Sequence, residues 1–163
     1  MTLAQLSALD RAAFVDAVGW VFEHSPWVAE RAWRRRPFGS LDDLVAAMTA
    51  ELEKGTDEEL LALLRAHPDL GSRARMTDAS RNEQEGAGLD SLAPAEFARL
   101  HELNAAYRTK FGFPFLYAVR GATTHDILEA LEARIPGCRE EEVNEALRQV
   151  LRIARFRLED TLS

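Results

Sequence analysis

Glycine and proline residues divide this chain into short segments, and that division constrains the fold more than any other feature. Only 9 Gly and 6 Pro occur among 163 residues, and they gather where apolar patterns stop, as at Pro37–Gly39, Pro68–Gly71 and Pro136–Gly137. Between these breaks, apolar residues recur at three- and four-residue spacing, which indicates amphipathic helices. The sequence therefore predicts an all-α fold of about eight helices, in a single domain that spans residues 1–163.

Cap residues and breakers locate these helices along the chain. The expected N-caps, each a hydroxyl residue ahead of an apolar stripe, are Ser25, Ser40, Thr56 and Thr124. The expected helices span about residues 14–22, 26–33, 41–52, 57–67, 80–87, 94–111, 124–135 and 139–162. The apolar run 113–119 fits a strand, a buried extended segment or a helix start, and these alternatives stay open.

Composition argues against several classes of protein. The formal charge of −7 at pH 7 disfavours general nucleic-acid binding, which needs a basic footprint. No run of about 18 apolar residues occurs, so no membrane-spanning helix is expected, and the first residues lack the pattern of a secretory signal peptide. The single cysteine, Cys138, cannot form an intramolecular disulfide or a multi-cysteine zinc site. These features predict a cytoplasmic protein that binds neither nucleic acid nor membrane.

The last expected helix carries one cation on its apolar face. At 100° per residue, Val143, Val150, Ala154 and Leu158 share one sector, and Arg157 falls inside it. A buried guanidinium needs a carboxylate or phosphate partner, because an unpaired buried charge is very costly. Arg157 is therefore either an anion-binding residue of a pocket or an edge residue whose side chain extends to water.

Three polar residues share one face of the short helix expected at residues 80–87. Ser80, Glu83 and Gln84 stand at positions i, i+3 and i+4. A hydroxyl, a carboxylate and an amide that converge in this way suit a small hydrogen-bonding ligand. The same spacing also fits a capping box with Ser80 as the N-cap and Glu83 as its partner.

His67 precedes Pro68 at the expected end of a helix. A helix C-terminus favours the charged imidazole, so this residue can exchange a proton near neutral pH. The alternative is an ordinary surface or structural histidine. A metal site is not expected, because no H-x-x-x-H or H-E-x-x-H spacing occurs.

Short motifs occur in order along nearly the whole chain. They are F-E-H-S-P-W at residues 22–27, R-P-F at 36–38, A-H-P-D-L at 66–70, E-Q-x-x-A-G-L at 83–89, F-G-F-P-F at 111–115 and R-L at 157–158. Together they resemble the family of 2-oxo-4-hydroxy-4-carboxy-5-ureidoimidazoline (OHCU) decarboxylases, which act in urate breakdown.

The resemblance implies an all-α homodimeric enzyme that needs neither cofactor nor metal and forms (S)-allantoin with stereospecific protonation. The catalytic residues that it implies are His67, Glu83 and Arg157. The substrate-binding residues that it implies are Pro68, Ser80, Gln84, Phe113, Phe115 and Leu116. The short loop that carries Arg73 and Arg75 departs from the family pattern, so no role is transferred to it.

The implied chemistry suits these residue types. Loss of CO2 leaves electrons that the ring imine and carbonyl of the substrate can accept, and the new carbanion carbon is then protonated from one face. Arg157 suits an anionic oxygen, and either His67 or Glu83 could deliver the final proton. Two other functions stay open. One is a non-catalytic helical binding module, and the other is an enzyme of the same fold that acts on a related ureido or hydantoin acid.

Overall fold

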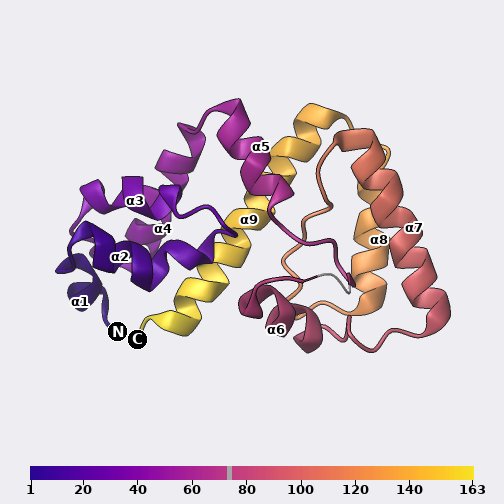
Figure 1. Ribbon diagram of the computed structural model, residues 1–163, viewed down its shortest axis with the longest axis horizontal. Helices are drawn as coiled ribbons and strands as arrows, with labels where there is room; N and C mark the ends of the chain where they lie inside the picture. The colour runs from indigo at the N-terminus through magenta and orange to yellow at the C-terminus, as the bar shows by residue number, and fades with distance from the viewer. Residues whose placement is uncertain (73–74) are drawn as a thin grey trace. The chain divides into compact units, whose positions relative to one another are not determined.

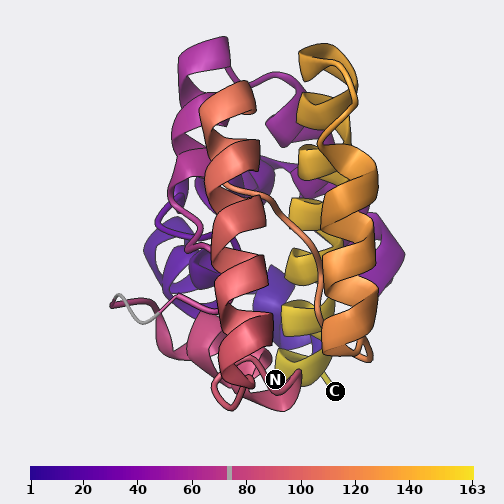
Figure 2. The same ribbon diagram turned by 90° about the vertical axis from the view of Figure 1, so that its right-hand side faces the viewer.

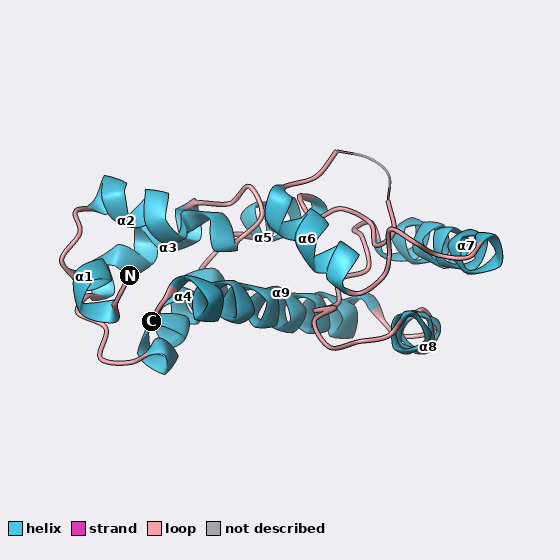
Figure 3. Ribbon diagram, turned by 90° about the horizontal axis from the view of Figure 1, so that it is seen from below, coloured by secondary structure: helices cyan, strands magenta, loops and turns pink. Residues whose placement is uncertain are grey.

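The computed structural model describes residues 1–72 and 75–163 (Figure 1), so Arg73 lies outside the described residues. Nine α-helices and two short 3-10 helices occur in these two ranges. No strand occurs in them, and Figure 3 accordingly shows no magenta segment. The all-α prediction is therefore confirmed. The helices belong to two compact units, one made of residues 1–66 and 150–163 and the other of residues 67–149.

The first unit is built from the N-terminal helices and the end of the last helix. Its elements are α1 (Leu3–Ser7), α2 (Arg11–Val18), η1 (Gly19–Val21), α3 (Trp27–Ala32), η2 (Trp33–Arg35), α4 (Leu41–Glu53), α5 (Asp57–Arg65) and the C-terminal part of α9 (Arg139–Thr161). Its fully buried side chains include Phe14, Val18, Leu44, Leu63 and Leu158. The two chain ends lie side by side (Figure 1), because the Ser163 N–H donates to the carbonyl oxygen of Met1 at 2.9 Å.

The second unit is built around two long helices and an irregular segment. Its elements are α6 (Asp78–Gly86), α7 (Pro94–Phe111), α8 (Thr124–Arg134) and the first part of α9. Helices α7 and α8 run side by side, in salmon and orange in Figure 2. The aromatic rings of the unit's core gather around Tyr107, whose ring centroid lies 4.6 Å from that of Phe111 and 5.5 Å from that of Phe115.

Local cap signals predict some helix starts correctly and others wrongly. The hydroxyl of Ser40 accepts from the Asp43 N–H, and Thr56 forms the expected capping box with Glu59. Ser25 does not cap α3, since its hydroxyl donates to the Glu23 carbonyl oxygen at 2.8 Å. The expected stripe at residues 14–22 is also not one helix, because α2 gives way to a 3-10 turn at Gly19.

Two further caps lie earlier than expected. Helix α6 begins at Asp78, where the Thr77 hydroxyl accepts from the Ser80 N–H at 3.2 Å, so Ser80 is inside the helix and is not its cap. Helix α8 is capped by Thr123 instead of Thr124. In each case the expected residue stands close to a threonine that precedes it, and that threonine supplies the cap.

Candidate active site

His67 begins the second unit, just after α5. Pro68 disfavours helical geometry for the residue before it, and α5 ends at Arg65 with Ala66 as its C-cap. The His67 residue is only 6% exposed. The interpretation as a surface histidine is therefore wrong, and the imidazole belongs to the buried polar groups of this unit.

Helix α6 presents its polar face inward. Ser80 and Gln84 are buried, and Glu83 is half-buried between them. The Gln84 Oε1 accepts from the Gly71 N–H at 2.9 Å. This bond joins α6 to the loop that follows His67, so residues from two motifs are held together inside one unit. The i, i+3, i+4 pattern thus reflects a buried polar face, and the capping box built on Ser80 is wrong.

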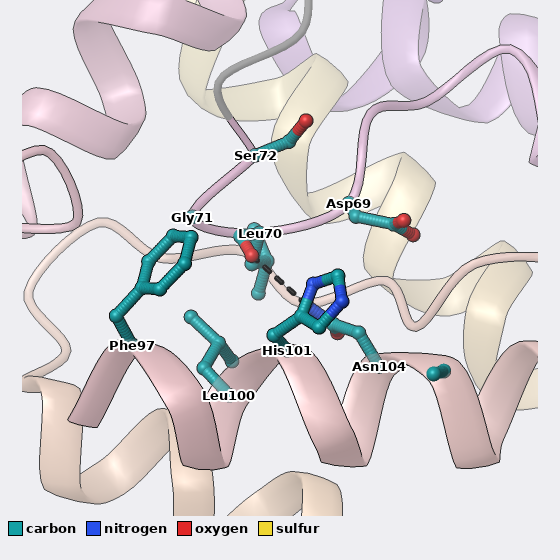
Figure 4. Close-up of a pocket in the computed structure, with 9 residues that line it drawn as sticks. Asp69, Leu70, Gly71, Ser72, Phe97, Leu100, His101 and Asn104 are labelled. Atoms are coloured by element: carbon teal, nitrogen blue, oxygen red, sulfur yellow. Dashed lines mark hydrogen bonds between the residues drawn. The ribbon is translucent and has the colours of Figure 1, made fainter. Parts of the chain in front are cut away.

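A second bond holds the same loop from the side of α7. The Asn104 Nδ2 donates to the Leu70 carbonyl oxygen at 2.9 Å (Figure 4). Within the described residues, the buried Oδ1 of Asn104 has no hydrogen-bond partner. A pocket of about 230 Å³ lies here, lined by Asp69, Leu70, Gly71, Ser72, Phe97, Leu100, His101, Asn104 and Ala105 (Figure 4). None of these is among the predicted site residues.

The segment 113–116 is a buried wall of the second unit. Residues 113–119 lie outside any helix or strand, so the interpretations as a strand and as a helix start are wrong, and a buried irregular segment remains. Phe113, Phe115 and Leu116 are each at most 3% exposed. The Leu116 carbonyl oxygen accepts from Arg134 Nη1 at 2.7 Å. These residues therefore face the protein interior in a fixed backbone conformation.

Arg157 lies in the first unit, on α9. It is 4% exposed, and its Nη2 donates to Glu23 Oε1 at 2.7 Å. Its Nη1 donates to the Trp20 carbonyl oxygen at 3.5 Å and to that of Val21 at 3.4 Å. The guanidinium is therefore buried and paired with a carboxylate of the chain itself, so the alternative of a side chain that extends to water is wrong, and the role of an anion-binding residue in a pocket stays a prediction.

Local geometry fixes the Glu23 carboxylate that meets Arg157. The next residue, His24, has a positive φ of 45°, and the Ser25 hydroxyl bonds back to the Glu23 carbonyl oxygen. Glu23 itself is 1% exposed. This arrangement accounts for the E-H-S part of the F-E-H-S-P-W motif at residues 22–27, which the sequence singled out without a role.

Eight of the nine predicted site residues belong to one unit. The second unit holds His67, Pro68, Ser80, Glu83, Gln84, Phe113, Phe115 and Leu116, and the first unit holds Arg157. Sequence reasoning missed Glu23, the partner of Arg157, and Arg134, the partner of Leu116. Glu23 could have been found from its place in the F-E-H-S-P-W motif. Arg134 could not, because an arginine near the end of a helix is common and its sequence neighbours do not indicate a partner.

The described residues offer no metal centre and no membrane span. No group of three or more His, Cys, Asp or Glu side chains is arranged to hold a metal ion in that part of the chain. None of the helices described there has the length and apolar character needed to cross a membrane. Cys138 is exposed, with its thiol outside any disulfide.

Comparison with known proteins gives the class of this helical protein. A family model described as OHCU decarboxylase matches residues 7–159. A protein from Halalkalicoccus jeotgali named 2-oxo-4-hydroxy-4-carboxy-5-ureidoimidazoline decarboxylase is 48% identical over 98% of this chain and 91% of its own length. A protein of the same name from Haloferax volcanii is 47% identical over 100% of this chain and 97% of its own.

A solved structure shares the fold of this chain. The crystal structure of an (S)-allantoin synthase matches with a TM-score of 0.82 and 36% identity, over 99% of this chain and 54% of that one. The fold and the family match together define the class of this protein. It is a carboxy-lyase whose described residues form helices and no strand. This chain belongs to the OHCU decarboxylase family.

Proposed function

We propose that this chain decarboxylates OHCU to (S)-allantoin in urate degradation and protonates the product carbon from one face. The observation that carries the proposal is the family match over residues 7–159, which spans every motif residue from Glu23 to Arg157. The named decarboxylases that are 47–48% identical to this chain support the same substrate.

The reaction divides into three tasks for the protein. The carboxylate must be held so that its bond to the ring breaks, the charge that develops on the ring must be stabilised, and a proton must reach the new carbanion carbon. The C–C electron pair of the departing CO2 passes into the imine and carbonyl of the substrate. Since the substrate itself accepts that pair, the proposed reaction needs neither a metal nor an organic cofactor.

The proposal gives each catalytic residue one task. Arg157 binds an anionic or carbonyl oxygen of the substrate, and the bond from its Nη2 to Glu23 Oε1 sets the orientation of its guanidinium. His67 moves a proton at the substrate hydroxyl or at the new C–H bond. Glu83 orients His67 or binds the ureido N–H groups. Either His67 or Glu83 delivers the final proton.

The proposed binding residues recognise the ureido group and enclose the ring. Ser80 supplies a hydroxyl, and Gln84 supplies its Nε2, because its Oε1 already accepts from the Gly71 N–H. Pro68 and the segment 113–116 form the pocket wall, with contacts from the backbone as well as from the side chains of Phe113, Phe115 and Leu116. Pro68 is half-buried and the others are buried, namely Ser80, Gln84, Phe113, Phe115 and Leu116, which supports these roles.

Optical activity of the product tests the proposal directly. Fresh substrate is made from urate by a urate oxidase and a 5-hydroxyisourate hydrolase, and allantoin formation is followed by circular dichroism. We expect optically active allantoin to form far faster than the racemic product of spontaneous decay. A racemic product at every concentration of purified protein would contradict the proposal.

The His67→Ala variant separates an enzyme from a binding module. The decarboxylase predicts a large loss of rate while the helical circular dichroism spectrum stays unchanged. If the protein is a binding module of the same fold, the substitution should change no activity or binding. If it is an enzyme for a related ureido or hydantoin acid, the wild-type protein should turn over that acid faster than OHCU.

We further propose a homodimer in the cytoplasm. The resemblance to the decarboxylase family supports the dimer, and one free, exposed cysteine is compatible with a reducing compartment. Light scattering after size-exclusion chromatography should give twice the chain mass of 18.3 kDa. A mass of one chain at micromolar concentration would contradict the dimer.

A further inference from the structure

The segment 113–119 needs hydrogen-bond partners that no regular structure supplies. Buried N–H and C=O groups almost always find partners, and this stretch lacks helical and strand geometry. Two side chains supply partners to it. Gln149 Oε1 accepts from the Ala118 N–H at 2.9 Å, and Arg134 Nη1 donates to the Leu116 carbonyl oxygen at 2.7 Å. The path of this wall therefore depends on side chains from α8 and α9.

Every nitrogen of the Arg134 guanidinium is engaged. Besides the bond from Nη1 to Leu116, Nε donates to Glu142 Oε1 at 2.8 Å, and Nη2 donates to the Tyr107 hydroxyl at 3.3 Å. The guanidinium carbon also lies 4.7 Å from the centroid of the Phe115 ring. Only arginine has a planar fork that can make these contacts at once, because a lysine ammonium is a point charge on a flexible stem.

The charges of this cluster balance one another away from water. The Arg134 and Glu142 side chains are 13% and 8% exposed, and Glu142 Oε1 also accepts from the Tyr107 hydroxyl at 2.8 Å. Burial, and then the bond to Glu142, raises the pKa of Tyr107 above its usual range, so the hydroxyl remains a donor. Glu142 and Tyr107 thus fix the Arg134 guanidinium, which in turn binds the Leu116 carbonyl oxygen.

We propose that Arg134 is a positioning residue of the active site: it fixes the backbone of residues 113–116 in the conformation that binds the substrate, with Glu142 and Tyr107 holding its guanidinium in place. The inference rests on the proposed decarboxylase function, in which this wall contacts the substrate. Arg134 itself needs no contact with the substrate, since it acts through the Leu116 carbonyl and the Phe115 ring.

The Arg134→Lys variant tests this role, because it keeps the charge and removes the fork. A looser wall should raise KM at least tenfold and lower the enantiomeric excess of allantoin, measured with enough enzyme to outrun spontaneous decay. Loss of folded protein alone would lower the apparent kcat and leave KM unchanged. Arg99→Lys is the matched control, since Arg99 makes an exposed ion pair with Glu132 of α8 in the same unit, and it should keep wild-type KM within about twofold.

A second variant keeps the proposal falsifiable if Arg134→Lys does not fold. Glu142→Gln preserves the size of the side chain and removes the carboxylate that orients the guanidinium, so KM should rise and enantiomeric excess should fall again. Wild-type KM and enantiomeric excess in either folded variant would overturn the positioning role. A racemic product from the wild-type protein would instead overturn the proposed function, so the two failures are distinguishable.

Discussion

At the scale of single residues, the ion pair of Arg157 and Glu23 has the most consequences. Both residues are at most 4% exposed, so each charge has lost most of its hydration. A buried pair of this kind gains little net stability over apolar residues, but removal of one partner leaves a costly unpaired charge. The pair therefore makes the orientation of Arg157 depend on Glu23.

The Glu23→Gln variant should reveal that dependence as a loss of stability. We expect the free energy of unfolding to fall by about 3–5 kcal/mol, because the Arg157 charge remains buried without its carboxylate. Urea denaturation followed by circular dichroism measures the difference. Glu159→Gln, which breaks an exposed pair with Arg155, is the control and should cost at most about 1 kcal/mol. Equal effects of the two changes would contradict the argument.

The Arg157→Lys variant tests the catalytic role proposed for the guanidinium. Lysine keeps the positive charge but cannot present two parallel donors to a carboxylate or carbonyl oxygen. We expect kcat/KM for OHCU to fall by about 100-fold, the size of effect that small misplacements of reacting groups produce. Arg155→Lys on the opposite, more exposed face of α9, where Arg155 pairs with Asp42, should change kcat/KM little. Near wild-type turnover in Arg157→Lys would give Arg157 a structural role only.

At the scale of helices, Glu59 combines two functions at the start of α5. Its Oε1 accepts from the Thr56 N–H in the capping box, and its carboxylate makes two bonds to Arg31 of α3, at 3.1 and 2.6 Å. The hydrogen bonds to Arg31 first, and then the bond from the Thr56 N–H, lower the pKa of Glu59 from 4.5 to about 2. The carboxylate thus links a helix start to a neighbouring helix of the same unit.

The lowered pKa of Glu59 predicts a definite pH dependence. Because the folded state binds this proton less tightly than the unfolded chain does, the contribution of Glu59 to stability is fully present above pH 4.5 and is lost as the pH falls to about 2. Glu59→Gln should therefore lower Tm at pH 7, with a difference from wild type that shrinks through this window. Thermal unfolding at several pH values measures it, and a difference that is constant between pH 7 and pH 3 would contradict the assignment.

Helix starts followed from the sequence only where no tertiary contact or preceding threonine competed with the expected cap. Ser40 and Thr56 cap as expected, because each hydroxyl finds the N–H three residues ahead. Ser25 has an equally good pattern, yet its hydroxyl bonds to the Glu23 carbonyl oxygen, in a turn where His24 has positive φ. The tertiary contact that places Glu23 therefore overrides the local preference of Ser25 for an N-cap position. The cap pattern alone does not indicate this contact.

In the candidate site, too, the features that depend on local sequence were predicted and the long-range contacts were not. The burial of Arg157 followed from helical periodicity, which needs only neighbours in the sequence. Its partner Glu23 is 134 residues away along the chain, and the link from Arg134 to Leu116 spans 18 residues and a change from helix to irregular backbone. Pairings of this kind depend on the tertiary fold, so sequence reasoning predicted the cation and missed the groups that hold it.

At the scale of the whole molecule, the net charge opposes the substrate that we propose. The chain carries a formal charge of −7 at pH 7, whereas OHCU is a carboxylate anion. At low ionic strength the surface charge reaches far into solution, with a Debye length of about 30 Å at 0.01 M against about 8 Å at 0.15 M. Buried charges such as Arg157 are screened much less than surface charges.

These two properties predict that salt accelerates the reaction at low substrate concentration. Added salt screens the repulsion between the acidic surface and the anion, and it leaves the attraction of the buried guanidinium nearly intact. We expect kcat/KM to rise on the order of two- to threefold between about 0.01 and 0.15 M ionic strength. Initial rates at substrate concentrations well below KM, measured by circular dichroism in sodium chloride and in sodium acetate, check this and separate screening from competition by one particular anion. A fall in kcat/KM in both salts would mean that exposed cations steer the substrate, and the search for binding residues would then move from Arg157 to the surface arginines.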